Sequence, residues 1–193
     1  MKIAVMSDIH DNVWNLEAAL RGIQEAEALV CCGDLCSPFV VTLLGQGFAL
    51  RPIYIIFGNN DGDAFRITQN AARFPNIQIK AEFLEAELGG RRIAAVHYNT
   101  IAAGLAASGR YDAVFFGHNH RFEIRREGAA LMVNPGTLMG WDPSAPEGGR
   151  SITATFAVYD TASGQAEGFR VGPPHGHTAA GLEISPRSEE RRV

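Results

Sequence analysis

Short apolar runs alternate with segments of helical periodicity in the first third of the chain, and this alternation limits the fold more than any other feature. The apolar runs are 3–6, 28–32 and 53–57, and each ends at a polar turn. After the first run, apolar residues recur from Val13 to Ile23 at the spacing of one helical face. Further helices are expected over 39–44 and 64–72. Strands that alternate with helices form a parallel sheet through right-handed crossovers, so an α/β fold is predicted.

The second half of the chain predicts a second sheet. Residues 83–88 and 92–96 flank Gly89-Gly90, a pattern typical of a hairpin. A helix over 101–107 and a buried strand over 113–116 follow. Four short β segments come next: 122–126, 130–133, 152–159 and 165–171. We expect these strands to form a mostly antiparallel sheet. The predicted fold class is therefore α/β, a four-layer α/β/β/α sandwich of two mixed sheets flanked by helices.

Length and charge limit the domain organisation and the partners. The chain has 193 residues, which suits a single domain over 1–171 followed by a flexible tail over 172–193. A content of 46% hydrophobic residues is too high for a disordered chain, and no apolar run is long enough to span a membrane. The formal net charge of −4 argues against an extended nucleic acid or a membrane surface as partner. A homo-oligomer is left open.

The three cysteines indicate free thiols. Cys31, Cys32 and Cys36 are an odd number within six residues, and the first two are adjacent in a predicted strand, so their side chains should face opposite sides of the sheet. Free buried thiols are typical of a reducing compartment. No signal peptide is visible before the first predicted strand, and a cytoplasmic location is therefore expected.

Side chains that can bind a metal follow the predicted strands at their carboxyl ends, where α/β sheets build their sites. All are oxygen or imidazole nitrogen donors, a set that suits Mn, Fe, Co, Ni or Zn in five- or six-coordinate geometry. Seven ligands are too many for one ion, but with one shared carboxylate they suit two ions about 3.5–4 Å apart. The residues are Asp8, His10, Asp34, Asn59, His97, His118 and His120.

Five motifs in this order resemble those of the calcineurin-like metallophosphoesterases, most closely the YfcE-like bacterial and archaeal phosphodiesterases. The motifs are Asp8-Ile-His10, Gly33-Asp34, Gly58-Asn59, the lone His97 and Gly117-His118-Asn119-His120. The segment Val133-Asn-Pro-Gly-Thr137 also resembles a stretch that follows the last motif in that family.

The resemblance implies two divalent metal ions, with manganese as the first choice and Fe, Ni, Co or Zn as alternatives. One ion would be held by Asp8, His10, Asp34 and His120. The other would be held by Asp34, Asn59, His97 and His118. Asp34 would thus bridge the ions, and a metal-bridging hydroxide would attack phosphorus in line.

The third motif departs from the family pattern. Many members have a histidine after Gly-Asn that protonates the leaving group, whereas this chain has Asn60. Asn60 cannot act as an acid, so we expect it, together with Asn59, to bind a phosphate oxygen. Losing a positioned proton donor costs about 10²–10⁴ in rate, and least where the leaving group is a stable anion. The predicted function is therefore hydrolysis of small phosphodiesters that are activated or cyclic.

Three neighbouring residues have weaker predictions. Asp61 would assist catalysis or cap the following helix. Tyr98 and Arg121 stand where the family usually has Gly and Pro, and each would narrow the substrate opening, with Arg121 also able to contact a second phosphate. His175 and His177, in the predicted tail, are not expected to be ligands.

Other functions remain open on the same fold. A eukaryotic cargo-sorting subunit is similar in fold and holds partner proteins, so a non-catalytic scaffold is one alternative. Such a scaffold should have lost ligands or expose apolar patches. A phosphomonoesterase or a nuclease is another, but a nuclease needs a basic track, and the chain offers only the pairs Arg91-Arg92 and Arg125-Arg126.

Overall fold

The structure, a computed structural model, describes residues 1–172 and 184–186. Its first sheet contains, in spatial order, β14 (Ile184–Pro186), β13 (Gln165–Val171), β12 (Thr155–Asp160), β1 (Lys2–Met6), β2 (Ala28–Cys31), β3 (Ile53–Ile55) and β4 (Ile77–Ile79). The second contains β5 (Phe83–Leu88), β6 (Arg91–Val96), β7 (Ala113–Phe115), β9 (Ala130–Pro135) and β8 (Phe122–Glu127). The helices of the described residues are α1 (Val13–Gly22), α2 (Phe39–Gly47), α3 (Ala64–Ala71), α4 (Asn99–Ala107) and the 3-10 turn η1 (Pro146–Gly148).

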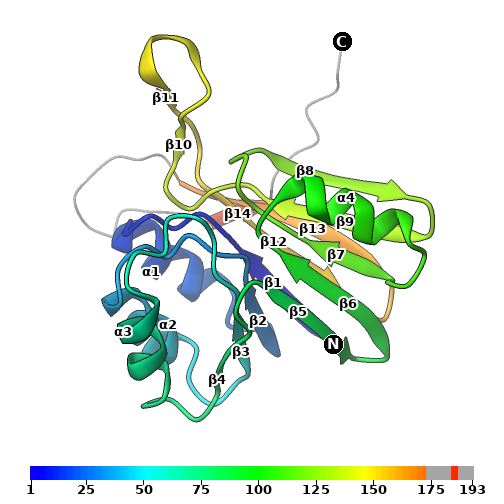
Figure 1. Ribbon diagram of the computed structural model, residues 1–193, viewed down its shortest axis with the longest axis horizontal. Coiled ribbons are helices and arrows are strands. Elements are labelled where there is room, and N and C mark those ends of the chain that lie inside the picture. Colours follow the sequence, from blue (N-terminus) through cyan, green and yellow to red (C-terminus); the bar gives the residue numbers. More distant parts are fainter. Residues whose placement is uncertain (173–183, 187–193) are drawn as a thin grey trace.

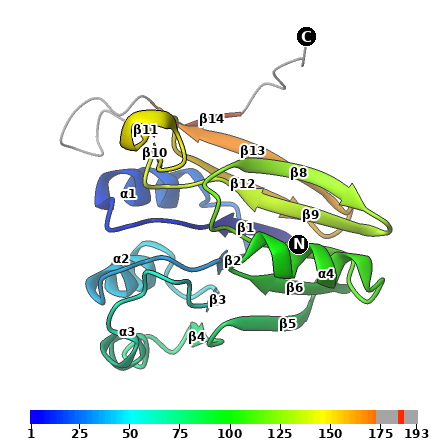
Figure 2. The same ribbon diagram turned by 45° about the horizontal axis from the view of Figure 1, so that its top comes forward.

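The two sheets pack face to face with helices outside, which confirms the predicted α/β/β/α sandwich. Figures 1 and 2 show α1, α2 and α3 on one side of the molecule and α4 on the other. Three apolar cores separate the four layers: one between the first sheet and α1 to α3, one between the sheets, and one beneath α4. Cys31 lies in the first of these cores and Cys32 in the second, so the two thiols face opposite sides of the sheet as predicted.

The predicted distribution of strands between the sheets is wrong in one respect. The segments expected over 152–159 and 165–171 form β12 and β13, and these join the first sheet, where β12 pairs antiparallel with β1. Four of the five residues of β1 are buried, so its backbone groups need a partner strand on both edges. The second sheet is correspondingly less antiparallel than expected, because β6, β7 and β9 run parallel and only its edge strands are antiparallel.

Two peripheral segments complete the fold. Residues 141–151 form a small arm, the β10–β11 arm, built from β10 (Trp141–Asp142) and β11 (Arg150–Ser151), and it rises from the body in yellow in Figure 1. Within the predicted tail, β14 pairs with β13, while His175, His177 and the other residues of 173–183 and 187–193 lie outside the described residues. In the part that is described, no helix is long and apolar enough to span a membrane.

Tyr159 on β12 provides a test of the packing between the sheets. Its ring packs edge-on against Phe115 with centroids 5.5 Å apart, but its buried hydroxyl has no hydrogen-bond partner among the described residues. A buried unsatisfied polar group costs about 1–3 kcal/mol. Tyr159→Phe should therefore raise the free energy of unfolding by about 1 kcal/mol in a urea titration. Tyr111→Phe, which removes a buried hydroxyl that interacts with Glu85, should lower it, and a loss of stability in both variants would contradict this reasoning.

Candidate metal centre

Both sheets contribute to the site, because the carboxyl ends of their parallel strands meet at one place. The loops that follow β1, β2 and β3 supply Asp8 with His10, Asp34 and Asn59. Those that follow β6 and β7 supply His97 and then His118 with His120. The structure thus brings together all seven side chains that the sequence nominated.

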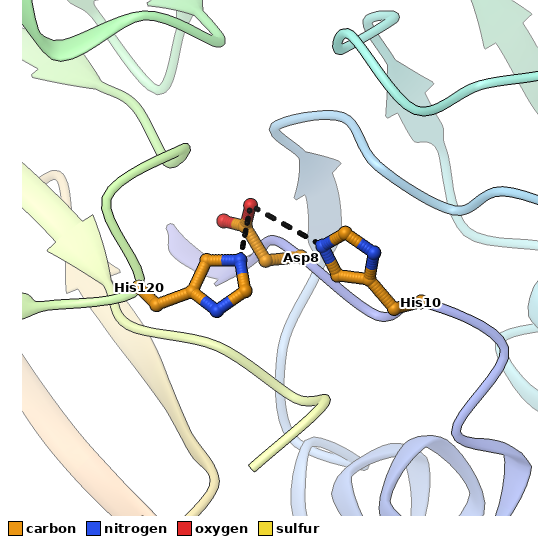
Figure 3. A group of neighbouring side chains, drawn as sticks. All are labelled: Asp8, His10 and His120. Carbon is orange, nitrogen blue, oxygen red and sulfur yellow. Dashed lines mark ion pairs between the residues drawn. The ribbon is translucent and has the colours of Figure 1, made fainter. Parts of the chain in front are cut away.

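Asp8 lies at one end of this group. Its side chain is fully buried, and the imidazoles of His10 and His120 approach it from either side (Figure 3). Asp8 Oδ1 is 3.4 Å from His120 Nε2 and 3.9 Å from His10 Nε2. Both Asp8 Oδ1 and His10 Nε2 are buried without a hydrogen-bond partner among the described residues. Two such atoms, aimed at the same small space, are what a cation would satisfy.

Asp34 connects Asp8 and its two histidines to the other candidate donors. Its Oδ2 atom is 3.5 Å from His10 Nε2 and equally 3.5 Å from His97 Nε2. Asn59 Oδ1 in turn lies 3.0 Å from His97 Nε2 and 3.0 Å from His118 Nδ1. The donors therefore form a continuous series in the order His120, Asp8, His10, Asp34, His97, Asn59 and His118.

Carbonyl groups of neighbouring loops orient two of the histidines. His97 Nδ1 is 2.8 Å from the carbonyl oxygen of Cys32, and His120 Nδ1 is 2.6 Å from that of Trp141. A hydrogen bond from Nδ1–H to a carbonyl leaves Nε2 free to face the carboxylates, which is the usual arrangement of metal-binding histidines. The sequence carried no signal for these contacts, because carbonyl groups are common to all residues.

Backbone strain concentrates in the same loops. Of ten non-glycine residues with positive φ in the described chain, seven belong to the loops 8–11, 34–36 and 118–120. They are Asp8, His10, Asp11, Asp34, Cys36, His118 and His120. Each such residue costs about 1–3 kcal/mol, and this strain persists only where surrounding contacts impose it.

Comparison with known proteins agrees with this geometry. Residues 1–164 match the model of the calcineurin-like phosphoesterase superfamily domain. The chain belongs to this superfamily. The predicted family and the predicted enzyme class, a hydrolase that acts on phosphoric ester bonds, are confirmed.

Individual relatives are similar over most of their length. A phosphodiesterase of Methanocaldococcus jannaschii is 29% identical over 165 residues, which are 83% of this chain and 93% of the relative. The structure of an archaeal phosphodiesterase has a TM-score of 0.76 at 25% identity, covering 89% of this chain and all of the other. Two structures below 25% identity share the fold alone. They are the Escherichia coli phosphoesterase YfcE (20% identity, TM-score 0.56, covering 89% and 91%) and vacuolar protein sorting 29 of Cryptosporidium parvum (18%, 0.66, covering 97% and 98%).

The Asn-Pro-Gly-Thr stretch of this phosphoesterase ties two of the ligand loops together. The side-chain amide of Asn134 donates to Gly117 O at 3.2 Å and to Asn119 Oδ1 at 2.8 Å, within the loop that carries His118. Thr137 Oγ1 donates to the carbonyl oxygen of Asp8 at 2.8 Å. The stretch thus supports the ligand loops rather than supplying a ligand.

Burial and neighbouring charges shift the pKa values of the titratable groups at this site in opposite directions. Burial alone would raise the pKa of Asp34, but hydrogen bonds with His97 and Asn60 outweigh it and hold the pKa well below its usual value. Burial would lower the pKa of His97, but the hydrogen bond with Asp34 and neighbouring charges together outweigh it, so the pKa is raised. The pKa of His120 is raised in the same way, with its hydrogen bond to Asp8 as the main cause. For His10 burial dominates and lowers the pKa. Because the pKa of His97 and of His120 is raised, a cation competes with protons at these two residues more than at an ordinary histidine.

Asp61 does not cap α3, which was one of the two roles expected for it from the sequence. The cap of α3 is Asp63, whose side chain accepts from Arg66 N. Asp61 instead accepts four backbone N–H groups: Oδ2 accepts from Asp34 and Gly58, at 3.0 and 2.7 Å, and Oδ1 accepts from Leu35 and Cys36, at 2.8 and 3.0 Å. One carboxylate thus joins the loop of Asp34 to the loop of Asn59, while the expected catalytic role of Asp61 stays a prediction.

Asp61→Asn tests this joining function. An amide has one oxygen, so its NH₂ group would face two backbone donors. We expect the free energy of unfolding to fall by about 2–3 kcal/mol and metal uptake to fall with it. Asp63→Asn is a matched control in the same loop, because asparagine caps a helix as well as aspartate does. Urea unfolding would contradict the assignment if the two variants were equally stable.

Proposed function

We propose that this phosphoesterase hydrolyses small phosphodiesters at a dinuclear metal centre held by the seven donors. The observation that carries the proposal is the continuous series of donors, with Asp8 Oδ1 and His10 Nε2 buried and unpartnered within it. The family match and the relative from Methanocaldococcus jannaschii, named as a phosphodiesterase, support the same reaction.

Asp34 is the proposed bridge between two cations. Its Oδ2 atom is equally far from His10 and His97, one histidine from each of the two ligand sets that the family resemblance implies. When bound, divalent ions would neutralise phosphoryl oxygens and activate the water that attacks phosphorus. Two such ions against the carboxylates of Asp8 and Asp34 leave a local charge of 4 − 2 = +2, since the other five donors are neutral when they bind metal. This local charge attracts a phosphate although the whole chain is acidic.

The substrate would approach from the side of Asn59, Asn60 and His118, because these residues are exposed whereas Asp8, Asp34 and His97 are buried. The Asn60 side-chain amide donates to Asp34 Oδ2 at 2.8 Å, and its backbone N–H donates to Asp34 Oδ1 at the same distance. The amide has a second N–H, which can donate to a phosphate oxygen. Asn60 therefore positions Asp34 and is free to contact substrate, but it cannot protonate a leaving group.

A nuclease function has little support from the surface. Arg125 pairs with Glu123 and Glu127, and Arg91 donates to the carbonyl oxygen of Thr161. Arg92 lies 3.9 Å from Asp112. Arg126 donates to the carbonyl oxygen of Ala129 at 3.3 Å. Both arginine pairs are thus engaged within the protein and form no track for a nucleic-acid backbone.

Turnover of bis(4-nitrophenyl) phosphate with added manganese, and then with other divalent metals, tests the proposal. Asp34→Asn should lower the rate by about 10²-fold or more and reduce metal content below two ions per chain, because the bridge loses half its donor capacity. Asp63→Asn should leave both unchanged. Normal turnover with two bound ions in Asp34→Asn would refute the bridging role. If the native protein neither binds metal nor hydrolyses the ester, a scaffold function is favoured.

Replacing Asn60 tests the absence of a proton donor. Asn60→His should raise the rate on dialkyl phosphates, whose leaving groups need a proton, by about tenfold or more. Asn60→Gln is the control, because glutamine is of similar size and cannot donate an acidic proton. Equal rates for the histidine and glutamine variants on the dialkyl substrate would show that proton donation at this position does not limit the reaction.

A further inference from the structure

A cavity of about 460 Å³ adjoins the candidate metal centre on the side of His120. Its walls include His120, Arg121, Phe122, Asp142, Arg150 and Arg170. The β10–β11 arm, which is the yellow hairpin of Figures 1 and 2, provides Asp142 and Arg150. Because His120 belongs both to this wall and to the donor series, the cavity borders the candidate metal centre.

A contact between a backbone carbonyl and an imidazole joins the arm to the candidate metal centre. The carbonyl oxygen of Trp141 lies 2.6 Å from His120 Nδ1, and the next residue, Asp142, lines the cavity. A group bound in the cavity therefore lies directly beside a residue that faces Asp8.

The charge of the cavity is opposite to that of the chain. Three arginines and one aspartate give 3 − 1 = +2, whereas the whole chain carries −4. Arg150 Nε is 3.7 Å from Asp142 Oδ2, so this pair partly compensates itself. Arg121 is exposed, and its charge acts on Asp142, which lines the same cavity. A guanidinium binds phosphate through two parallel hydrogen bonds, so Arg121 is suited to a second anionic group beside the candidate metal centre.

We propose that this cavity binds a second phosphate group of the substrate, so that the preferred substrate is a small phosphodiester that also carries a terminal phosphate. The inference rests on the proposed phosphodiesterase function. The volume of the cavity lies within the range of about 300–1,000 Å³ that is usual for small-molecule sites, and a phosphate together with part of a sugar fits within it.

Two dinucleotides that differ only in a terminal group provide the test. The 5′-phosphorylated dinucleotide pApA and its unphosphorylated form ApA share the scissile diester. We expect the native enzyme, loaded with manganese, to hydrolyse pApA with a kcat/KM about tenfold higher than that for ApA. The difference should lie mainly in KM, because one charge-assisted hydrogen bond stabilises the bound substrate by about this factor. This preference should weaken as the salt concentration rises, because the arginines are accessible to solvent.

Variants of single arginines localise the effect. Arg121→Ala should reduce the ratio of the two kcat/KM values to near one, and Arg121→Lys should retain part of it, because lysine keeps the charge but loses the paired hydrogen bonds. Arg92→Ala is the control, since Arg92 lies at the start of β6, at the opposite end of the strand from His97, and should leave the ratio unchanged.

The outcomes separate the two proposals. Equal turnover of ApA and pApA by the native enzyme, or a preference that survives in Arg121→Ala, would overturn the cavity assignment while the phosphodiesterase function stands. If the native enzyme hydrolyses none of the three substrates, ApA, pApA and bis(4-nitrophenyl) phosphate, both proposals are overturned.

Discussion

Two buried carboxylates at the meeting point of the sheets, Asp8 and Asp34, impose the main constraint on this structure. A buried charge without a partner costs several kcal/mol, so a fold that buries two of them side by side needs compensating positive charge. The imidazoles around them supply it when protonated, and a metal ion would supply it more strongly. The strained loops and the four N–H groups bound by Asp61 are explained by the same need, because both hold the donors close together.

The four-layer arrangement makes this meeting point possible. The apolar core between the sheets aligns the carboxyl ends of their parallel strands, so donors separated by as many as 112 positions, from Asp8 to His120, become neighbours. The same arrangement leaves one side open at Asn59 and His118, and it places the β10–β11 arm beside His120. A buried cluster of candidate metal donors, an exposed side and a cavity lined by arginines thus result from one packing of two sheets.

Local pattern predicted most of the elements, because hydrophobic periodicity and turn residues act over a few positions. The strands at 83–88 and 165–171 and the helix that begins at Phe39 were found in this way. Membership of a sheet was harder to predict. β12 and β13 were assigned to the wrong sheet, since their pattern shows that they are strands but not that β1 needs a partner on its second edge. The short strand β4 and the β10–β11 arm were missed for lack of a strong apolar signal.

By itself the sequence determined the fold class and the family and nominated seven candidate donors, because the order of motifs at strand ends is a local and specific signal. Only the tertiary structure decided what Asp61 does, which carbonyl groups orient His97 and His120, and which strands flank β1. It also placed Arg121, Arg150 and Arg170 around one cavity. These features depend on contacts between segments far apart in the chain, and such contacts form only when the two sheets pack.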